Sequence, residues 1–232
     1  MQSIYLTRLL MSYGILANMI QSSVNNDKRV ALRGGGSAKK PLGERKPECR
    51  IIAIGTHKGR HNRSLDRRLK GLREGDRVVL EYGGDYCKYN WAAIASNPDG
   101  YHESELSFGQ FRETYTHAIA KIKSLGAQPV LLTLPTLLPQ RFFDHISRNL
   151  NRDNLLQWLG GDVCALNRWQ EQFNEEILSL AAQHQLAVID INNAFLQHNY
   201  MENCYRSDGM HPNSIGDAVI EELVANWNSR QN

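Results

Sequence analysis

The chain has 232 residues, of which 41% are hydrophobic and 22% charged, so it is long and apolar enough to fold as one α/β domain rather than remain disordered. Its formal net charge is +3. No apolar run approaches the ~20 residues that cross a bilayer. The apolar segment 9–20 is interrupted by polar residues and is not followed by a clean cleavage site, so we expect a cytoplasmic protein without a membrane span.

Positive charge is concentrated in the stretch 28–73, which holds fifteen Lys and Arg residues against three acidic ones. Such a block can bind nucleic acid or an anionic surface. No aromatic residue that could stack on a base lies within it, so a solvated helix face and a basic loop are the favoured interpretation. The four cysteines are widely spaced, without a C-x-x-C pair, and indicate neither a zinc site nor a disulfide framework.

Taken in chain order, strands and helices alternate along the sequence. A short strand is predicted at 4–7, a helical stretch from there to about residue 22, and a basic, glycine-rich loop from 25 to 47. Short helices and turns are predicted between 142 and 159. The remaining strands are predicted at 50–54, 77–82, 129–134 and 187–191, and the remaining helices at 63–73, 108–125, 162–184 and 213–227.

This alternation predicts a single domain over residues 1–232, with a three-layer α/β/α sandwich around a central parallel sheet. Strands that are apolar on both sides are typical of parallel sheets covered by helices on both faces. Ligands of such sheets bind beyond the carboxyl ends of the strands. That rule points to residues 8–12, 55–57, 83–86 and the loop before His211.

The strongest local signal is the run S-D-G-M-H-P-N at 207–213, directly ahead of the last predicted helix. A tight turn with Asp208 and His211 three residues apart can place a carboxylate beside an imidazole. The carboxylate then fixes the tautomer of the imidazole and stabilises the imidazolium that forms in base catalysis. An isolated D-x-x-H is a weak signal, whereas D-G-x-H-P-N before a helix is much more specific.

Two further stretches follow predicted strands: Gly55-Thr56, and the run E-Y-G-G-D-Y at 81–86. Together with the Asp208–His211 turn they resemble the SGNH (GDSL-like) hydrolase superfamily of serine esterases and acylhydrolases. The resemblance covers residues 4 to about 224 and implies a flavodoxin-like fold. It implies hydrolysis of a carboxylic ester, such as an acyl group on a small molecule, carbohydrate or lipid, without a metal or cofactor.

Carried over residue by residue, the resemblance makes His211 the general base, Asp208 its orienting partner and Gly55 an oxyanion donor. Two positions depart from the family pattern. Asp85 stands where the family has the oxyanion Asn, and Leu10 stands where it has the serine nucleophile. An ionised carboxylate offers only acceptors, and an aliphatic side chain cannot form an acyl-enzyme. We therefore expect hydrolysis to be weak or absent.

Other residues could compensate in part. Ser12 could act as a nucleophile if the turn were remodelled, although a hydroxyl at a helix N-terminus is the favoured interpretation. Ser37 follows three glycines, but without the spacing of a P-loop, and is interpreted as part of a surface loop. Tyr86 and Trp91 could line a substrate pocket, whereas tryptophans at such spacing more often belong to the core.

Three interpretations therefore remain open. The first is an SGNH-type esterase or acylhydrolase that is weakened or inactive. The second is a non-catalytic descendant of that fold, which binds a ligand or regulates a partner. The third, ranked last, is an anion-binding or nucleic-acid-binding protein that uses the basic block 28–73.

Overall fold

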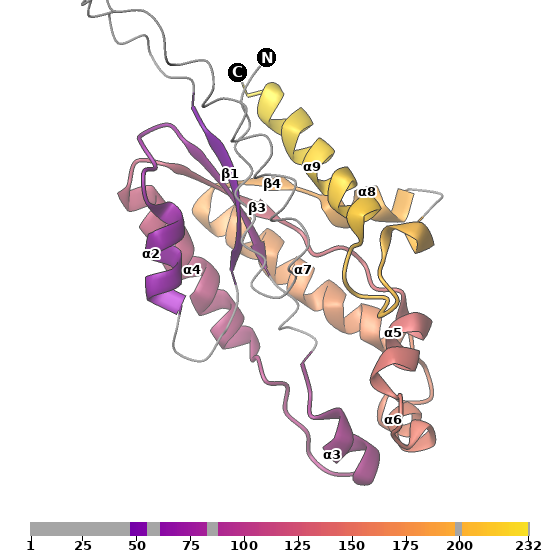
Figure 1. The fold of residues 1–232 in the computed structure, drawn as a ribbon. Coiled ribbons are helices and arrows are strands. Elements are labelled where there is room, and N and C mark those ends of the chain that lie inside the picture. Colours follow the sequence, from indigo (N-terminus) through magenta and orange to yellow (C-terminus); the bar gives the residue numbers. More distant parts are fainter. Residues whose placement is uncertain (1–46, 55–60, 83–87, 198–200, 232) are drawn as a thin grey trace, which may run out of the picture.

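The computed structural model describes residues 47–54, 61–82, 88–197 and 201–231. In these ranges the chain forms a four-stranded parallel sheet with helices on both faces, as predicted (Figure 1). The strand predicted at 4–7, the helical stretch after it and residues 25–46 of the basic loop lie outside the described residues. The described elements are β1 (Cys49–Ile54), α2 (His61–Leu69), β2 (Arg77–Tyr82), α3 (Trp91–Ser96), α4 (Phe108–Ser124), β3 (Gln128–Leu132), α5 (Pro139–Ile146), α6 (Arg152–Trp158), α7 (Ala165–His184), β4 (Ala187–Ile189), α8 (Ile191–Gln197), the short 3₁₀ helix η2 (Met201–Cys204) and α9 (Ser214–Ser229).

The strands after residue 47 are confirmed, and β2 lies at the predicted residues. β3 ends two residues earlier than predicted, because the backbone N–H of Leu134 donates to the side chain of Asn174 on α7 (2.7 Å). β4 also ends two residues early. The side chain of Asp190 accepts the backbone N–H of Asn193 (3.0 Å), which starts α8 at a place predicted to be strand.

The helices match the prediction less closely at their ends. α2 ends at Leu69 rather than at residue 73, ahead of Gly71, whose φ of +81° lies in the left-handed region. α4 starts where predicted, because Ser107 and Gln110 form a capping box. The segment predicted as short helices and turns forms α5 and α6, and α3 was not predicted.

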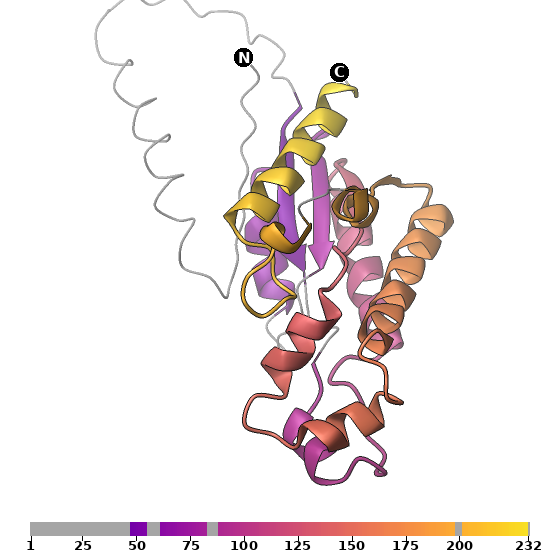
Figure 2. The same ribbon diagram turned by 90° about the vertical axis from the view of Figure 1, so that its right-hand side faces the viewer.

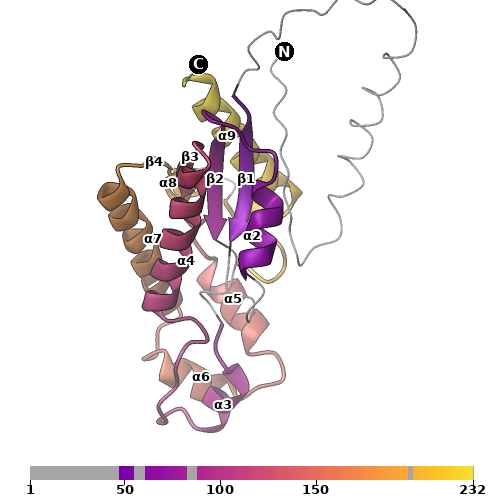
Figure 3. The same cartoon turned by 90° about the vertical axis from the view of Figure 1, so that its left-hand side faces the viewer.

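The strand order in the sheet is β1-β2-β3-β4, without a reversal. Because parallel crossovers are right-handed, successive crossovers in one direction place all their helices on the same face. The two buried clusters agree with this rule. Leu65 of α2 and the buried residues of α4 and α7 lie in one cluster, and Ile191 of α8 and Ile220 of α9 lie in the other. Figures 2 and 3 show α9 across the strands from α4 and α7.

Alternate residues of each strand supply the two clusters, as the pleat of a sheet requires. Val78, Leu80 and Tyr82 of β2 face α2, α4 and α7, whereas Val79 faces the side of α9. All four side chains are buried. The strand is therefore apolar on both sides because both sides are covered, which is what its continuous apolar sequence predicted.

The carboxyl ends of the strands all lie at one edge of the sheet, because all pairings are parallel. Beyond this edge lie α3, α5 and α6 (Figure 1). The loop 205–213, which carries the Asp208–His211 turn, contacts the start of α5 at this end of the molecule. The fold therefore brings the strongest sequence signal to the edge at which ligands bind in parallel sheets.

Candidate active site

Asp208 and His211 form the pair that the sequence predicted. The Nδ1 atom of His211 lies 2.7 Å from Oδ2 of Asp208, with side-chain exposures of 26% and 17%. An ionised carboxylate can only accept, so Nδ1–H is the donor and Nε2 is the basic atom of the ring. This is the tautomer that a histidine needs in order to accept a proton at Nε2.

Two backbone groups hold the Asp208 carboxylate in place. Its Oδ1 atom accepts the N–H groups of Met210 and His211, each at 2.9 Å. Burial alone would raise the pKa of this carboxyl, but the hydrogen bonds from the side chain and backbone of His211 and from the backbone of Met210 outweigh burial. The pKa of Asp208 therefore lies well below its usual range. The carboxylate stays ionised beside the imidazole at neutral pH.

Gly209 lets the turn lie directly against the start of α5. Its φ is +71°, and a Cβ atom there would lie 2.8 Å from the backbone N of Phe142 and 2.8 Å from the Cβ of Arg141. The backbone N–H of Leu138 donates to the carbonyl oxygen of Gly209 (2.9 Å). A side chain at position 209 would thus force the turn away from α5. The D-G pair in the sequence signalled a turn but not this contact.

The other end of the turn is held by the start of α9. The side chain of Asn213 accepts the backbone N–H groups of Ile215 (2.9 Å) and Gly216 (3.2 Å). It also donates to the carbonyl oxygens of Asn203 (2.7 Å) and Tyr205 (3.0 Å). One side chain therefore caps the helix and ties it to the segment before the turn.

The loop after β3 is hydrogen-bonded both to α7 and to the segment that precedes Asp208. Asn174 and Gln170 of α7 bond the backbone of residues 134 and 135 in a buried setting. The hydroxyl of Tyr205 donates to the carbonyl oxygen of Thr136. These contacts join α7, this loop and the segment that carries Asp208. Sequence patterns gave no sign of them, because the partners are more than thirty residues apart.

Most of the other predicted site residues cannot be located relative to this pair. Leu10, Ser12, Gly55, Asp85 and Tyr86 lie outside the described residues. Trp91 is described and is half-buried at the start of α3. Its ring packs on those of Tyr89 (5.5 Å between centroids), Trp158 (6.0 Å) and Phe142 (6.3 Å).

This aromatic group is continuous with the hydrophobic core. Trp91 thus fits the alternative that places it in the core, although Phe142 connects it to the Gly209 turn. Within the described ranges, no group of His, Cys, Asp and Glu residues is arranged to hold a metal ion. In the same part of the chain, no helix is long and apolar enough to cross a membrane.

Part of the basic block is also described, and the charge of Arg50 is paired with an acidic residue of the same fold. Arg50 pairs with Glu48 through a 2.6 Å contact and donates to the carbonyl oxygen of Lys70 (2.9 Å). Another member, Arg67, is exposed. At least one residue of the block, Arg50, therefore has a structural role, because its side chain connects β1 to the end of α2.

No protein-family model matches the chain, and neither does any curated protein. Several solved structures are similar in fold. A lipase/acylhydrolase from Enterococcus faecalis has 19% identity and a TM-score of 0.45, over 72% of this chain and 68% of that one. A GDSL-like lipase from Bacteroides thetaiotaomicron has 11% identity and a TM-score of 0.43, over 78% and 88%.

A putative acylhydrolase from Bacteroides fragilis has 14% identity and a TM-score of 0.43, over 94% of this chain and 99% of that one. An acetyl xylan esterase from Geobacillus stearothermophilus has 13% identity and a TM-score of 0.40, over 68% and 63%. With TM-scores below 0.5, these likenesses leave the function of the chain to be inferred from its own residues.

Proposed function

We propose that the chain is an SGNH-type ester hydrolase whose proton-transfer pair is retained and whose turnover is weak or absent. His211 is the general base, Asp208 orients it, and the substrate is a carboxylic ester of a small molecule, carbohydrate or lipid. The observation that carries the proposal is the 2.7 Å contact between His211 Nδ1 and Asp208 Oδ2 at the carboxyl edge of the sheet.

The expected loss of turnover follows from the sequence at two other positions. A general base accelerates attack only when a hydroxyl lies within hydrogen-bond reach of it, and Leu10 supplies none. His211 is then left to activate water. Loss of one oxyanion donor costs about 10²–10³ in rate, and Asp85 offers a carboxylate where that donor is expected.

Hydrolysis of p-nitrophenyl acetate tests this proposal. The wild-type rate should be low, and His211→Ala should reduce it to the buffer rate because the general base is gone. A serine-directed phosphonate should neither inhibit nor label the protein. Fast, His211-dependent turnover that the phosphonate abolishes would contradict the assignment of Leu10 to the nucleophile position.

A second candidate is a non-catalytic binding module, and the pairing of β1 with β2 favours it. In a flavodoxin-like sheet of order 2-1-3-4-5, the first strand lies between the second and the third. Here the strands predicted as second and third pair with each other along six residues, from Cys49↔Arg77 to Ile54↔Tyr82. A strand that carries a nucleophile therefore has no place between them.

This candidate predicts binding without turnover. Hexanoate, as a carboxylate product analogue, should shift the NMR signals of the His211 imidazole in the wild type while p-nitrophenyl acetate is not hydrolysed above the buffer rate. Absence of any shift at millimolar hexanoate would argue against a retained acyl site.

A further inference from the structure

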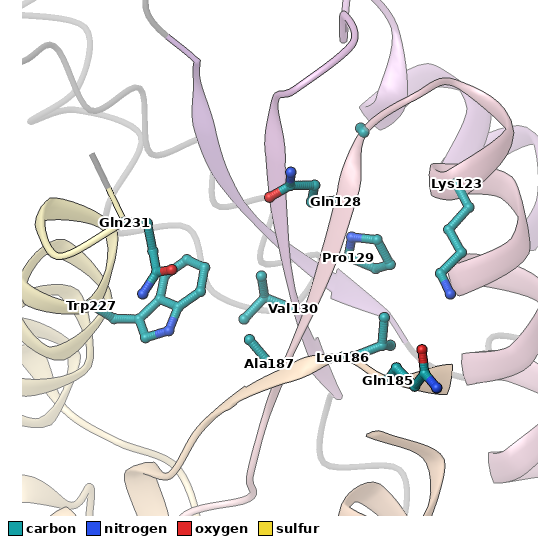
Figure 4. Close-up of a pocket in the computed structure, with 10 residues that line it drawn as sticks. Lys123, Gln128, Pro129, Val130, Gln185, Leu186, Ala187, Trp227 and Gln231 are labelled. Atoms are coloured by element: carbon teal, nitrogen blue, oxygen red, sulfur yellow. The ribbon is translucent and has the colours of Figure 1, made fainter. Parts of the chain in front are cut away.

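A cavity of about 350 Å³ lies at the amino ends of β3 and β4, and Val130, Ala187 and Trp227 belong to its lining (Figure 4). The turn that carries Asp208 and His211 lies beyond the carboxyl ends of the strands, at the opposite edge of the sheet. None of the described turn residues lines the cavity. The groups that fix His211 therefore come from its own loop and not from this cavity.

Arg206 bonds the carbonyl groups of His211 and of the residue after it. Its backbone N–H donates to the carbonyl oxygen of His211 (2.9 Å), and its side-chain Nε–H donates to the carbonyl oxygen of Pro212 (3.1 Å). Tyr205 and Pro212 form an antiparallel bridge beside these bonds. Arg206 is half-buried, so the bonds are partly shielded from water. Two consecutive carbonyl groups are thus held by one residue.

Asp208 holds the same histidine at its other backbone group. The carboxylate of Asp208 accepts the backbone N–H of His211 (2.9 Å) as well as the ring Nδ1–H (2.7 Å). Both polar groups of the His211 backbone are therefore bonded, the N–H by Asp208 and the carbonyl oxygen by Arg206. Neither peptide group that flanks the histidine can rotate without breaking a hydrogen bond, so the direction in which the ring leaves the backbone is fixed.

The side-chain bond of Arg206 has a specific geometric requirement. Pro212 has no backbone N–H, so its carbonyl oxygen is the polar group through which a hydrogen bond can hold it. The donor is a guanidinium, and hydrogen bonds from a charged donor are stronger than neutral ones. Lysine has a methylene group at the position of Nε, so a lysine side chain cannot donate from the same place.

We propose that Arg206 is a positioning residue for His211. Its side chain holds the peptide group that follows the histidine, so that the imidazole keeps its Nδ1–H on Asp208 and presents Nε2 as the basic atom. Arg206 acts through the backbone of the loop and not on a reacting atom. The inference rests on the proposed function, which makes His211 the general base.

NMR of the ¹⁵N-labelled full-length protein tests the proposal without a substrate. In the wild type, the neutral ring of His211 should be the Nδ1–H tautomer, and this proton should exchange slowly with water. Arg206→Met keeps the aliphatic part of the side chain but removes the donor, so the proton should exchange at least about tenfold faster. The Nε2–H tautomer should then appear as well. The ring signals are assigned by their loss in His211→Gln.

Two further variants separate the hydrogen bond from charge and from a general loss of stability. Arg206→Lys keeps the charge but has no donor at the Nε position, so it should behave like Arg206→Met. Arg141→Met is the matched control, because Arg141 is also half-buried beside the turn but donates to the carbonyl oxygen of Glu202 (3.1 Å). It should leave the tautomer of His211 and the exchange rate of its Nδ1–H unchanged.

A measurement on the wild type covers the case in which Arg206→Met does not fold. The Nε–H of Arg206 should exchange at least about tenfold more slowly than that of free arginine, because it is bonded to Pro212. Exchange at the rate of free arginine would overturn the proposal. So would a wild-type tautomer and exchange rate of His211 in folded Arg206→Met or in Arg206→Lys.

These outcomes are distinct from those of the hydrolysis assay. If p-nitrophenyl acetate is not hydrolysed in a His211-dependent way but the tautomer responds to Arg206 as expected, the proposed function fails and the positioning role of Arg206 stands. If hydrolysis depends on His211 but the tautomer ignores Arg206, only the positioning role is lost.

Discussion

His211 and Asp208 contact each other through two different groups: the imidazole Nδ1 meets Oδ2 at 2.7 Å, and the backbone N–H of His211 donates to Oδ1 at 2.9 Å. Both carboxylate oxygens are thereby fixed by one residue. The orientation of the ring is consequently coupled to the backbone of the turn, so a change in the turn also reorients the imidazole.

Replacing Asp208 with Asn should destabilise the fold in a pH-dependent way. The pKa of Asp208 is lower in the folded chain than the value of about 3.9 expected when unfolded. Its stabilising contribution is therefore fully present above about pH 5 and is lost as the pH falls through the folded-state pKa. Urea unfolding should show a wild-type advantage of about 1–3 kcal/mol at pH 7 that shrinks below about pH 4.

Asp153→Asn is the matched control for this measurement, because Asp153 is an exposed carboxylate in the first turn of α6. Its effect on the free energy of unfolding should be a fraction of that of Asp208→Asn at neutral pH. If the difference between wild type and Asp208→Asn were the same at pH 3 and pH 7, the carboxylate would not be the stabilising group.

Gly209→Ala should destabilise the protein by about 2–4 kcal/mol, since it combines left-handed backbone strain with a steric clash against α5. The added Cβ would meet Arg141 and the backbone of Phe142 at 2.8 Å. Gly161→Ala separates the two causes: its φ is +80° but no atom lies within 4 Å of the new Cβ. That control should cost only about 1–2 kcal/mol in chemical unfolding.

Asn213→Ala should cost more than an ordinary cap substitution, about 2 kcal/mol, because the side chain also bonds two carbonyl oxygens before the turn. Asn151→Ala provides the comparison, since Asn151 caps α6 through a single bond to the N–H of Asn154 (3.1 Å). Its expected cost is about 1 kcal/mol. Equal losses in urea unfolding would mean that the bonds to Asn203 and Tyr205 contribute nothing.

The parts of the fold that are local in sequence could be predicted. β2 is a continuous apolar run between turn residues, so its limits were clear. The Asp208–His211 pair was also readable, because both members lie on one tight turn. α8 was missed because Ile191 continues an apolar run, while the bond from Asn193 to Asp190 that starts the helix leaves no periodic pattern.

Contacts between distant residues could not be predicted. Gln170 and Asn174 hydrogen-bond the backbone of residues 134 and 135, and Gly209 contacts α5. Both depend on tertiary packing, which local sequence patterns do not reveal. The predicted roles of Leu10, Gly55 and Asp85 stay predictions, because these residues lie outside the described ranges. The sequence thus predicted the contact between Asp208 and His211, but not the structure that holds it.

Restoring the family pattern at the altered positions separates the two proposed functions. A variant combining Arg8→Gly, Leu9→Asp and Leu10→Ser with Asp85→Asn carries a nucleophile and an oxyanion amide. If residues 8–10 lie beside the Asp208–His211 pair, hydrolysis of p-nitrophenyl acetate should rise by at least about 10²-fold. The gain should disappear with His211→Ala and on labelling with a serine-directed phosphonate.

The direct pairing of β1 with β2 makes the opposite result informative. If the variant unfolds in urea like the wild type but gains no activity, residues 8–10 do not reach His211. The continuous hydrogen bonding between Cys49–Ile54 and Arg77–Tyr82 would then be the reason, because it closes the position between the second and third strands. The Asp208–His211 pair would remain as part of a binding site, since no serine hydroxyl would lie within reach of the imidazole to form an acyl-enzyme.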